Sequence, residues 1–572
     1  MAIFASRTQT VFRRQAALLL FLVLSCALAG AASGPKFYDD DPIAVEPEIR
    51  DASQVTYRKI NLFYDLLLHQ FATPGGLPPG PRAGNVNTID EVPDSSWFTN
   101  RILARDVSPA EAARGPLTGA GPAPGPWVVI QAKTEGAAPG FTVRDSAGVT
   151  WFLAFDPTSN PEGATGAAVV ASKIFWTLGY YQAEYFIAEL RREQLSVDPE
   201  ATFRPPSGRE RKMTLKDIEP VLHRVARKAD GSYRVLASKL LPGKVLGGFK
   251  YYGTRSDDPN DIVPHEDRRE LRALKVFGAW TNLVDMKALN TMDTLITENG
   301  RSYVRHYLLD VGSTFGMGAN GPREWFEGYE HLFEPKIALK RTATVGFYIQ
   351  PWQTVEYDEY SSIGRFEGDQ FDPEAWKTRV PVSALLRARA DDLFWAARRL
   401  MAFSDDMIRA IVKTGAYSDT EAAAHLADVL IKRRDKIGKT YLTPVNPLVD
   451  FSLTASGELR FTNPAVQYGF ARAPDSYTAA WSTFDNNSGA TRLIAKTSGP
   501  GMSISAPQDL PSATGSFILV EVSAVGAPHE SWTKPVKAYF RRTGNGWKLV
   551  GLERMPDSTA PLAAAGAPGG SQ

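Results

Sequence analysis

The stretch that most constrains this chain of 572 residues runs from 271 to 316, where we expect a helix, a polar loop and a hairpin in succession. The loop reads Asp-Met-Lys-Ala-Leu-Asn, which places Asn290 five residues after Asp285. Two strand-like runs follow, and the Asn-Gly pair between them is a specific signal for a hairpin turn. The second run ends in Leu-Leu-Asp-Val-Gly at Asp310. Because a hairpin returns to its starting end, we expect Asp285, Asn290 and Asp310 to surround one cleft.

These residue types suit phosphoryl transfer with a divalent metal. Asp285 is a candidate base for a substrate hydroxyl, and Lys287 would neutralise charge on the transferred group. Mg²⁺ takes oxygen ligands from one or two side chains plus phosphate, and Asn290 and Asp310 would supply them. A second interpretation stays open, in which Asp285 caps a turn and Asp310 accepts hydrogen bonds from the Gly-Ser backbone that follows it.

Other chemistries find little support in the sequence. It has seven His and one Cys and contains neither H-E-x-x-H nor C-x-x-C, so a zinc site is not expected. A G-x-S-x-G nucleophile elbow is also missing from the sequence. Because the formal net charge is only +1, the chain lacks the basic character of nucleic-acid-binding proteins, and we expect no nucleic-acid partner.

The N-terminus has the pattern of an export signal. Arg13 and Arg14 precede an apolar run over 16–24, which is too short for a membrane span, and small residues follow as far as Ala32. The only cysteine, Cys26, follows Val-Leu-Ser as in a lipobox. Either Cys26 is lipidated and becomes the mature N-terminus, or it is discarded with the signal peptide. We expect an exported protein, periplasmic or secreted, whose only membrane contact is a lipid on Cys26.

The rest of the chain favours an α+β fold. A proline- and glycine-rich arm contains one expected helix at 55–70, whose apolar residues fall near helical spacing. Strands at 127–131, 141–144 and 149–155 then precede a helix closed by Gly179. A helix over 265–279 leads into the Asp285 loop, and 317–322 is expected to be a loop. Of three later helices, the last two have Ser404 and Asp419 as candidate N-caps. The expected regions are a signal peptide (1–33), an arm with a linker (34–125), an αβ unit (126–200), a helical region (201–442), a small β domain (443–556) and a disordered tail (557–572).

Four segments carry a resemblance to a known family. They read FDPTSNPEGATGAAVVASKIFWTLGY, GTRSDDPNDIVPHEDRRELRAL, NLVDMKALNTMD and YLLDVGSTFG. Residues 133–441 resemble the atypical kinase-like fold of HipA-type and spore-coat CotH-type proteins, and more closely a group of exported bacterial proteins. The resemblance implies a small β-rich N-lobe and a larger helical C-lobe, with ATP and Mg²⁺ or Mn²⁺ bound between them. It implies no particular substrate, whether protein or small molecule.

The sequence departs from that family where a kinase grips the nucleotide phosphates. A strand Lys paired with a helix Glu forms this grip, yet Ala154 and Ala168 stand at the two positions. Lys173 and Lys133 are the candidates to replace the Lys, although neither has its spacing. Two hypotheses follow. The first is a kinase-like phosphotransferase, or a degenerate pseudokinase, that binds nucleotide and metal. The second is a non-catalytic envelope protein that uses the same fold as an interaction scaffold.

Overall fold

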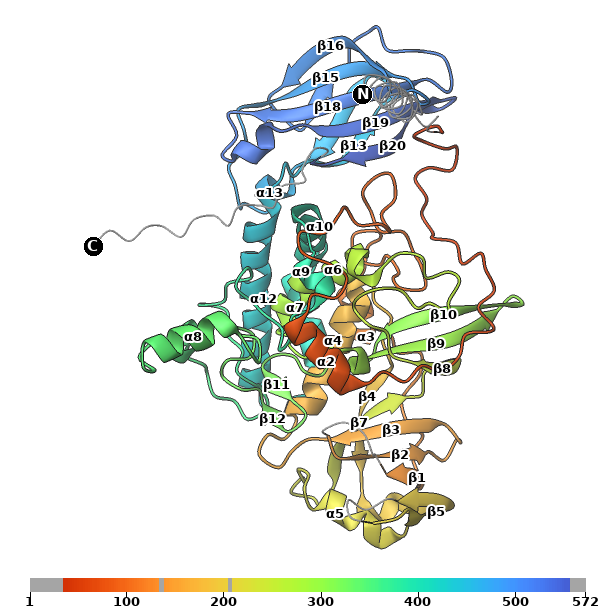
Figure 1. Ribbon diagram of the computed structural model, residues 1–572, viewed down its shortest axis with the longest axis vertical. Coiled ribbons are helices and arrows are strands. Elements are labelled where there is room, and N and C mark those ends of the chain that lie inside the picture. Colours follow the sequence, from red (N-terminus) through yellow and green to blue (C-terminus); the bar gives the residue numbers. More distant parts are fainter. Residues whose placement is uncertain (1–33, 133–137, 204–207, 556–572) are drawn as a thin grey trace, which may run out of the picture.

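The computed structural model describes residues 34–132, 138–203 and 208–555, and these form a mixed α+β protein. Figure 1 shows a β-rich region at each end of the long axis and a helical region between them. The expected signal peptide with Cys26, the expected disordered tail and Lys133 lie outside the described residues.

A seven-stranded sheet forms one end of the molecule, in the order β4-β7-β3-β2-β1-β5-β6. Its strands are β1 (Trp127–Ala132), β2 (Gly140–Arg144), β3 (Thr150–Phe155), β4 (Tyr185–Leu190), β5 (Leu195–Phe203), β6 (Arg211–Lys212) and β7 (Tyr233–Lys239). Alternating residues such as Val129, Val143 and Val235 are buried in one core, which the short helix α5 (Glu219–Leu222) completes. The strands predicted at 127–131, 141–144 and 149–155 are confirmed.

Helix α4 (Gly163–Leu178) is the helix predicted to end at Gly179, and it packs against this sheet. Buried Asp156 fixes its first turn, because its two carboxylate oxygens accept hydrogen bonds from the backbone N and the hydroxyl of Thr165, each at 2.8 Å. The helix ends at Gly179, whose φ is +131°. A side chain there would overlap the ring of Phe98, so both the backbone angle and the close approach require glycine.

The arm supplies α2 (Leu62–Phe71) and α3 (Pro109–Arg114), and the central region supplies α6 (Arg269–Arg272), α7 (Leu274–Thr281), α8 (Pro335–Ala343), α9 (Ser383–Leu386), α10 (Ala390–Met401), α11 (Asp405–Lys413) and α12 (Thr420–Leu442). Ser404 and Asp419 cap α11 and α12 as predicted. The helix predicted at 55–70 begins only at α2, where the Asn61 side chain accepts a hydrogen bond from the backbone N of Tyr64.

The prediction of one helix over 265–279 is wrong. A 3₁₀ turn at His265–Asp267 is followed by α6 and α7, and the break comes at Arg268, whose backbone is extended. The Arg268 side chain is buried, and it lies 3.4 Å from Glu46 of the arm and 3.5 Å from Glu270. Asp261 is a third carboxylate, at 3.9 Å. An arginine can be buried at this point because these carboxylates surround it.

After α7 the chain forms the predicted hairpin. Strands β8 (Lys244–Gly247), β9 (Thr291–Glu298) and β10 (Arg301–Leu308) make a sheet in the order β10-β9-β8. Asn299 and Gly300 join β9 to β10 with φ of +52° and +75°, the left-handed angles that an Asn-Gly turn adopts. The segment at 317–322, expected to be a loop, instead forms the two-stranded pair β11 (Met317–Gly318) and β12 (Gly321–Pro322), with Met317 buried.

Strands predominate after residue 443, as predicted. One sheet consists of β13 (Val449–Leu453), β14 (Glu458–Thr462) and β17 (Ser503–Ser505); the other consists of β15 (Ser476–Phe484), β16 (Thr491–Gly499), β18 (Phe517–Val525), β19 (Val536–Thr543) and β20 (Gly546–Glu553). A short helix, α13 (Pro464–Gln467), lies between β14 and β15 in the chain. The arm starts on the larger sheet, where Phe37 packs against Phe484 and Tyr539 and where Lys36 lies 2.6 Å from Glu553.

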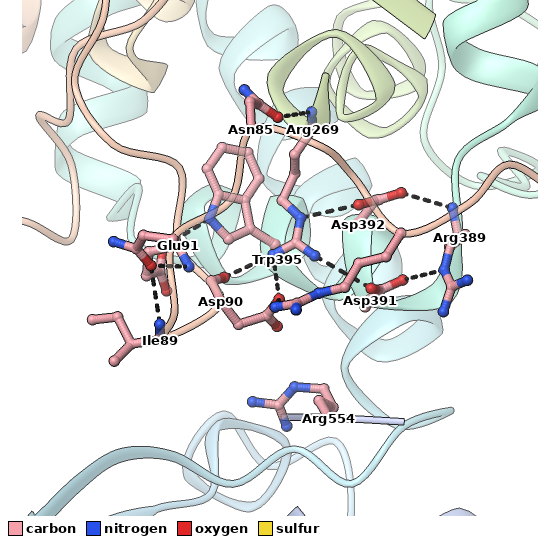
Figure 2. A network of polar contacts seen from close by, with 12 residues as sticks. Asn85, Ile89, Asp90, Glu91, Arg269, Arg389, Asp391, Asp392, Trp395 and Arg554 are labelled. Atoms are coloured by element: carbon pink, nitrogen blue, oxygen red, sulfur yellow. Dashed lines mark hydrogen bonds and ion pairs between the residues drawn. The ribbon is translucent and has the colours of Figure 1, made fainter. Parts of the chain in front are cut away.

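A buried charge network joins the arm to the central helices (Figure 2). Fully buried Arg269 of α6 lies 2.9 Å from Asp90 of the arm. The same guanidinium lies 3.0 Å from Asp392 and 3.3 Å from Asp391, both at the start of α10. The arm therefore fixes α6 in place, and α6 leads through α7 into the Asp285 loop.

Candidate functional site

Asp285 lies in the short loop between α7 and a 3₁₀ turn at Ala288–Asn290. Three cations surround its carboxylate. Lys287 donates a hydrogen bond to Oδ2 at 2.8 Å, Arg323 lies 3.6 Å from the same oxygen, and Arg379 lies 4.0 Å from Oδ1. Burial alone would raise the pKa of Asp285, but the three cations outweigh burial and hold that pKa below its usual value. Asp285 is therefore ionised and is a weak proton acceptor.

Glu327 is the second carboxylate of this cluster. It lies 3.7 Å from Arg323 and 3.6 Å from Arg379, and burial raises its pKa despite both arginines. Neither the Nε atoms of these arginines nor Oε2 of Glu327 has a hydrogen-bond partner among the described residues. Three cations thus face two carboxylates, and the cluster keeps excess positive charge beside Asp285.

Asn290 connects the Asp285 loop to the far end of the hairpin. Its side-chain Nδ2 donates to the backbone oxygen of Asp285 at 2.6 Å. Its own backbone oxygen accepts hydrogen bonds from the backbone N of Leu309 and of Asp310, each at 3.0 Å. The hairpin therefore brings Asp285, Asn290 and Asp310 together, and their backbones are tied by hydrogen bonds.

Asp310 is exposed at the turn after β10, and Oδ1 accepts a hydrogen bond from the backbone N of Gly312 at 3.2 Å. This is the turn-forming contact of the alternative interpretation. Within the described ranges, Asp310 makes no ion pair, and no group of three or more His, Cys, Asp or Glu is placed to hold a metal. Mg²⁺ would rest on the Asp310 carboxylate and the amide oxygen of Asn290, with phosphate and water completing its shell.

The wall of α4 and β3 that packs against the Asp310 turn is apolar. A Cβ on Gly312 would lie 3.3 Å from the Cβ of Ala168 on α4. Ala168 belongs to a small apolar cluster against which Leu236 of β7 packs. Ala154 of β3 is directly paired with Leu236, and directly paired residues of adjacent strands point to the same face of a sheet. The two alanines therefore lie on the side of the sheet and helix that faces the Asp310 turn.

Lys173 does not lie on this wall. It follows Ala168 by five residues, which corresponds to about 140° around a helix, and its side chain packs where a Cβ on Gly115 would come within 2.7 Å. Lys173 is buried, and burial lowers its pKa to about 8. No ion pair to it occurs in the part of the chain that the structure describes. The structure thus brings Asp285, Lys287, Asn290 and Asp310 together and separates Lys173 from them.

Sequence reasoning missed Arg323, Arg379 and Glu327. Arg323 directly follows β12, and Arg379 comes almost a hundred residues after Asp285. No local motif surrounds either arginine, so only the folded chain reveals that they meet at Asp285. Arg323 also donates a hydrogen bond to the hydroxyl of Ser313, which ties the segment after Asp310 to the same cluster.

Comparison with known proteins gave one type of match. No family model and no curated protein matches the chain. Among solved structures, a Golgi casein kinase with Mn/ADP bound is similar over 55% of this chain and 74% of that chain, with 10% identity and a TM-score of 0.27. Another structure of the Golgi casein kinase is similar over 55% of this chain and 73% of that chain, with 9% identity and a TM-score of 0.26. TM-scores this low describe a distant likeness, from which nothing further follows about this chain.

Proposed function

We propose that this chain is a kinase-like protein that binds a nucleotide with Mg²⁺ or Mn²⁺ but does not transfer its phosphoryl group. The proposal rests on one observation, the apolar wall with Ala154 and Ala168 opposite Asp310. Phosphoryl transfer depends on cations that hold the phosphates and neutralise the developing charge. An alanine at each position removes that contribution, while Asn290 and Asp310 keep oxygen atoms that suit a hard metal ion.

The electrostatics of Asp285 support the same conclusion. A general base works best when its pKa is near the working pH, whereas three cations depress the pKa of Asp285. Lys287 and the two arginines add positive charge, which suits binding of an anionic ligand more than removal of a proton. We therefore assign Asp285 and Lys287 to ligand binding in this protein.

The test is thermal unfolding with ATP, in the presence and absence of Mg²⁺ or Mn²⁺, together with a phosphoryl-transfer assay. We expect a metal-dependent rise in Tm that Asp310→Ala abolishes, and no transfer above the background given by Asp285→Asn. Measurable transfer by the wild-type chain would overturn the loss of activity. A Tm that ATP and metal leave unchanged would overturn nucleotide binding.

A double substitution tests the missing grip directly. Ala154→Lys with Ala168→Glu would place an ion pair beside Asp310, and a charge-assisted hydrogen bond contributes about 1.5–3 kcal/mol. We expect the doubly substituted chain to bind ATP and metal at least about tenfold more tightly than the wild type. The single Ala168→Glu change is the control, because it adds an anion near the phosphates and should weaken binding.

We further propose that the protein is exported. It is then either periplasmic, with or without a lipid anchor on Cys26, or secreted. Support comes only from the sequence of residues 1–33. Intact-mass measurement of the protein purified from membranes tests the anchor, with Cys26→Ser as the control. A mature N-terminus beyond Cys26 would exclude lipidation.

A further inference from the structure

Helix α2 exposes an apolar stripe and buries two polar side chains. One stripe of apolar residues points to solvent, with exposed fractions of 73% for Phe63 and 68% for Phe71, and Leu67 is exposed as well; the other leucines of the helix are half-buried. Its polar residues Asp65 and His69 are buried at 1% and 3% exposure. Helices of globular proteins normally turn the apolar stripe toward the core. An apolar stripe left open to water on this scale indicates a surface that a partner covers.

A second exposed apolar segment begins at α8, which projects from the side of the central region in Figure 1. Leu339 on the helix is 70% exposed, and beyond its end Val345, Phe347 and Ile349 are 85%, 87% and 67% exposed. The last three alternate along the chain. Large side chains exposed to this degree at a projecting segment make few contacts with the rest of the fold.

The two segments contact each other where the second one begins. The rings of Phe71 and Phe333 lie 5.7 Å apart. The side-chain Nε2 of Gln70 donates a hydrogen bond to the backbone oxygen of Phe333 at 2.7 Å. Phe333 lies two residues before the start of α8 in the chain. We call this the α2–α8 surface; it comprises Phe63, Leu67, Phe71, Phe333, Leu339, Val345, Phe347 and Ile349.

The charge of this surface is positive. Residues 335–355 contain Lys336, Lys340 and Arg341 but no Asp or Glu. Two acids that precede α8 are already paired: Glu334 lies 2.7 Å from Lys377, and Glu330 lies 3.2 Å from Arg341. Lys336 and Lys340 make no ion pair within the described ranges. The surface therefore combines exposed apolar side chains with uncompensated lysines.

From these observations we infer that the α2–α8 surface binds an anionic lipid bilayer. Segments with aromatic and aliphatic side chains flanked by Lys and Arg lie in the interface of a membrane, with the apolar groups below the headgroups and the cations against them. Each Lys or Arg near an anionic surface strengthens this binding, and the effect weakens with salt. In the described ranges no helix is long and apolar enough to cross a membrane, so the contact would be interfacial. This inference is independent of the proposed function.

Hydrogen–deuterium exchange of the full chain provides a local test. We expect peptides covering 62–71 and 335–350 to exchange more slowly with vesicles that contain phosphatidylglycerol than without vesicles. Pure phosphatidylcholine vesicles should give little protection, because the lysines would lack a charged partner. Unchanged exchange on phosphatidylglycerol, equal protection on both lipids, or protection that appears with protein concentration alone would each overturn the inference; the last would indicate a second copy of the chain as the occupant.

Variants test the same surface by vesicle co-sedimentation. Val345→Asp with Phe347→Asp should weaken binding to phosphatidylglycerol vesicles at least about tenfold, a change that corresponds to only about 1.4 kcal/mol. The matched control is Ile262→Asp with Leu493→Asp, at exposed apolar positions outside the α2–α8 surface (71% and 57% exposed). Because residues 1–33 are identical in all these chains, they cannot cause a difference between the variants. Equal loss from both pairs, or from neither, would contradict the proposal.

Discussion

Replacing Arg269 with methionine tests whether the buried charge network holds the arm and the central helices together. Methionine fills much of the arginine volume, so the change removes charge and hydrogen bonds more than packing. In the wild type, Nε of Arg269 donates to Asp392 at 3.0 Å and a terminal nitrogen donates to the backbone oxygen of Asp90 at 2.7 Å. Without the arginine, the carboxylates of Asp90, Asp391 and Asp392 lose a common partner.

The partners that remain set the size of the loss. Asp392 keeps Arg272 at 3.1 Å, Asp391 keeps Arg389 at 3.1 Å, and Asp90 keeps Arg82 at 3.0 Å. Removing one member of a buried charge pair typically costs about 3–5 kcal/mol. Because none of the three carboxylates is left without a cation, we expect the free energy of unfolding to fall by about 3 kcal/mol, the lower end of that range.

Urea unfolding followed by tryptophan fluorescence measures this loss, since Trp395 lies in the network (Figure 2). The control is Arg409→Met, which breaks an exposed 2.7 Å contact with Asp428 and should cost less than about 1 kcal/mol. The deficit of Arg269→Met should also shrink at pH 5, because a carboxylate that loses its partner has a raised pKa and takes up a proton sooner. A loss no larger than that of the control, or one identical at pH 5 and pH 8, would refute the reasoning.

Three further substitutions have defined outcomes in the same unfolding assay. Asp285→Asn should lower the free energy of unfolding by about 1–3 kcal/mol at pH 7. Because the folded-state pKa of Asp285 is depressed, this difference between the wild type and the variant should disappear as the pH falls below about 4. Lys173→Met should raise stability by about 1–3 kcal/mol below pH 8, and the gain should shrink toward pH 10.5 because the buried lysine loses its proton with a pKa of about 8. Gly179→Ala should cost at least about 2 kcal/mol, since its methyl group meets Phe98, whereas Gly148→Ala, with open space around it, should cost about 1 kcal/mol. Equal losses from the two glycine changes, or a pH-independent effect at either charged position, would contradict these assignments.

Local signals account for the parts of the fold that could be predicted. The Asn299-Gly300 turn needs two left-handed residues in a row, which few other pairs supply, and it fixed the hairpin that brings Asp310 back to Asn290. Ser404 and Asp419 identified helix starts because their side chains satisfy backbone N–H groups within three residues. Each of these interactions lies within a few residues of the signal, so no knowledge of distant contacts was needed.

The features that could not be predicted depend on partners far along the chain. A charged residue in a helix, such as Arg269, is normally expected to face solvent. Its carboxylate partners instead come from the arm and from α10, more than a hundred residues away on either side. Arg323 and Arg379 meet Asp285 only after the segment beyond β10 has folded back. Helical spacing in α2 found the apolar stripe correctly, but periodicity alone does not say whether a stripe faces the core or a partner.

One physical rule connects the buried network with the apolar wall of the candidate site. A buried charge is destabilising without a partner, and Arg268 and Arg269 each have at least two carboxylates within 4 Å. Buried Lys173 has no ion pair among the described residues, and its pKa is lowered to about 8. The wall avoids an unpaired charge in another way. Ala154 and Ala168 stand at both positions of the expected Lys–Glu pair, so neither charge is left there without its partner. Had only one alanine appeared, the remaining charge would cost several kcal/mol, and a compensating group would be needed beside Asp310. The buried residues clustered with Ala168 are Val169, Ala183 and Tyr185. The wall is therefore a self-consistent apolar surface, which agrees with the proposal that nucleotide binds without phosphoryl transfer.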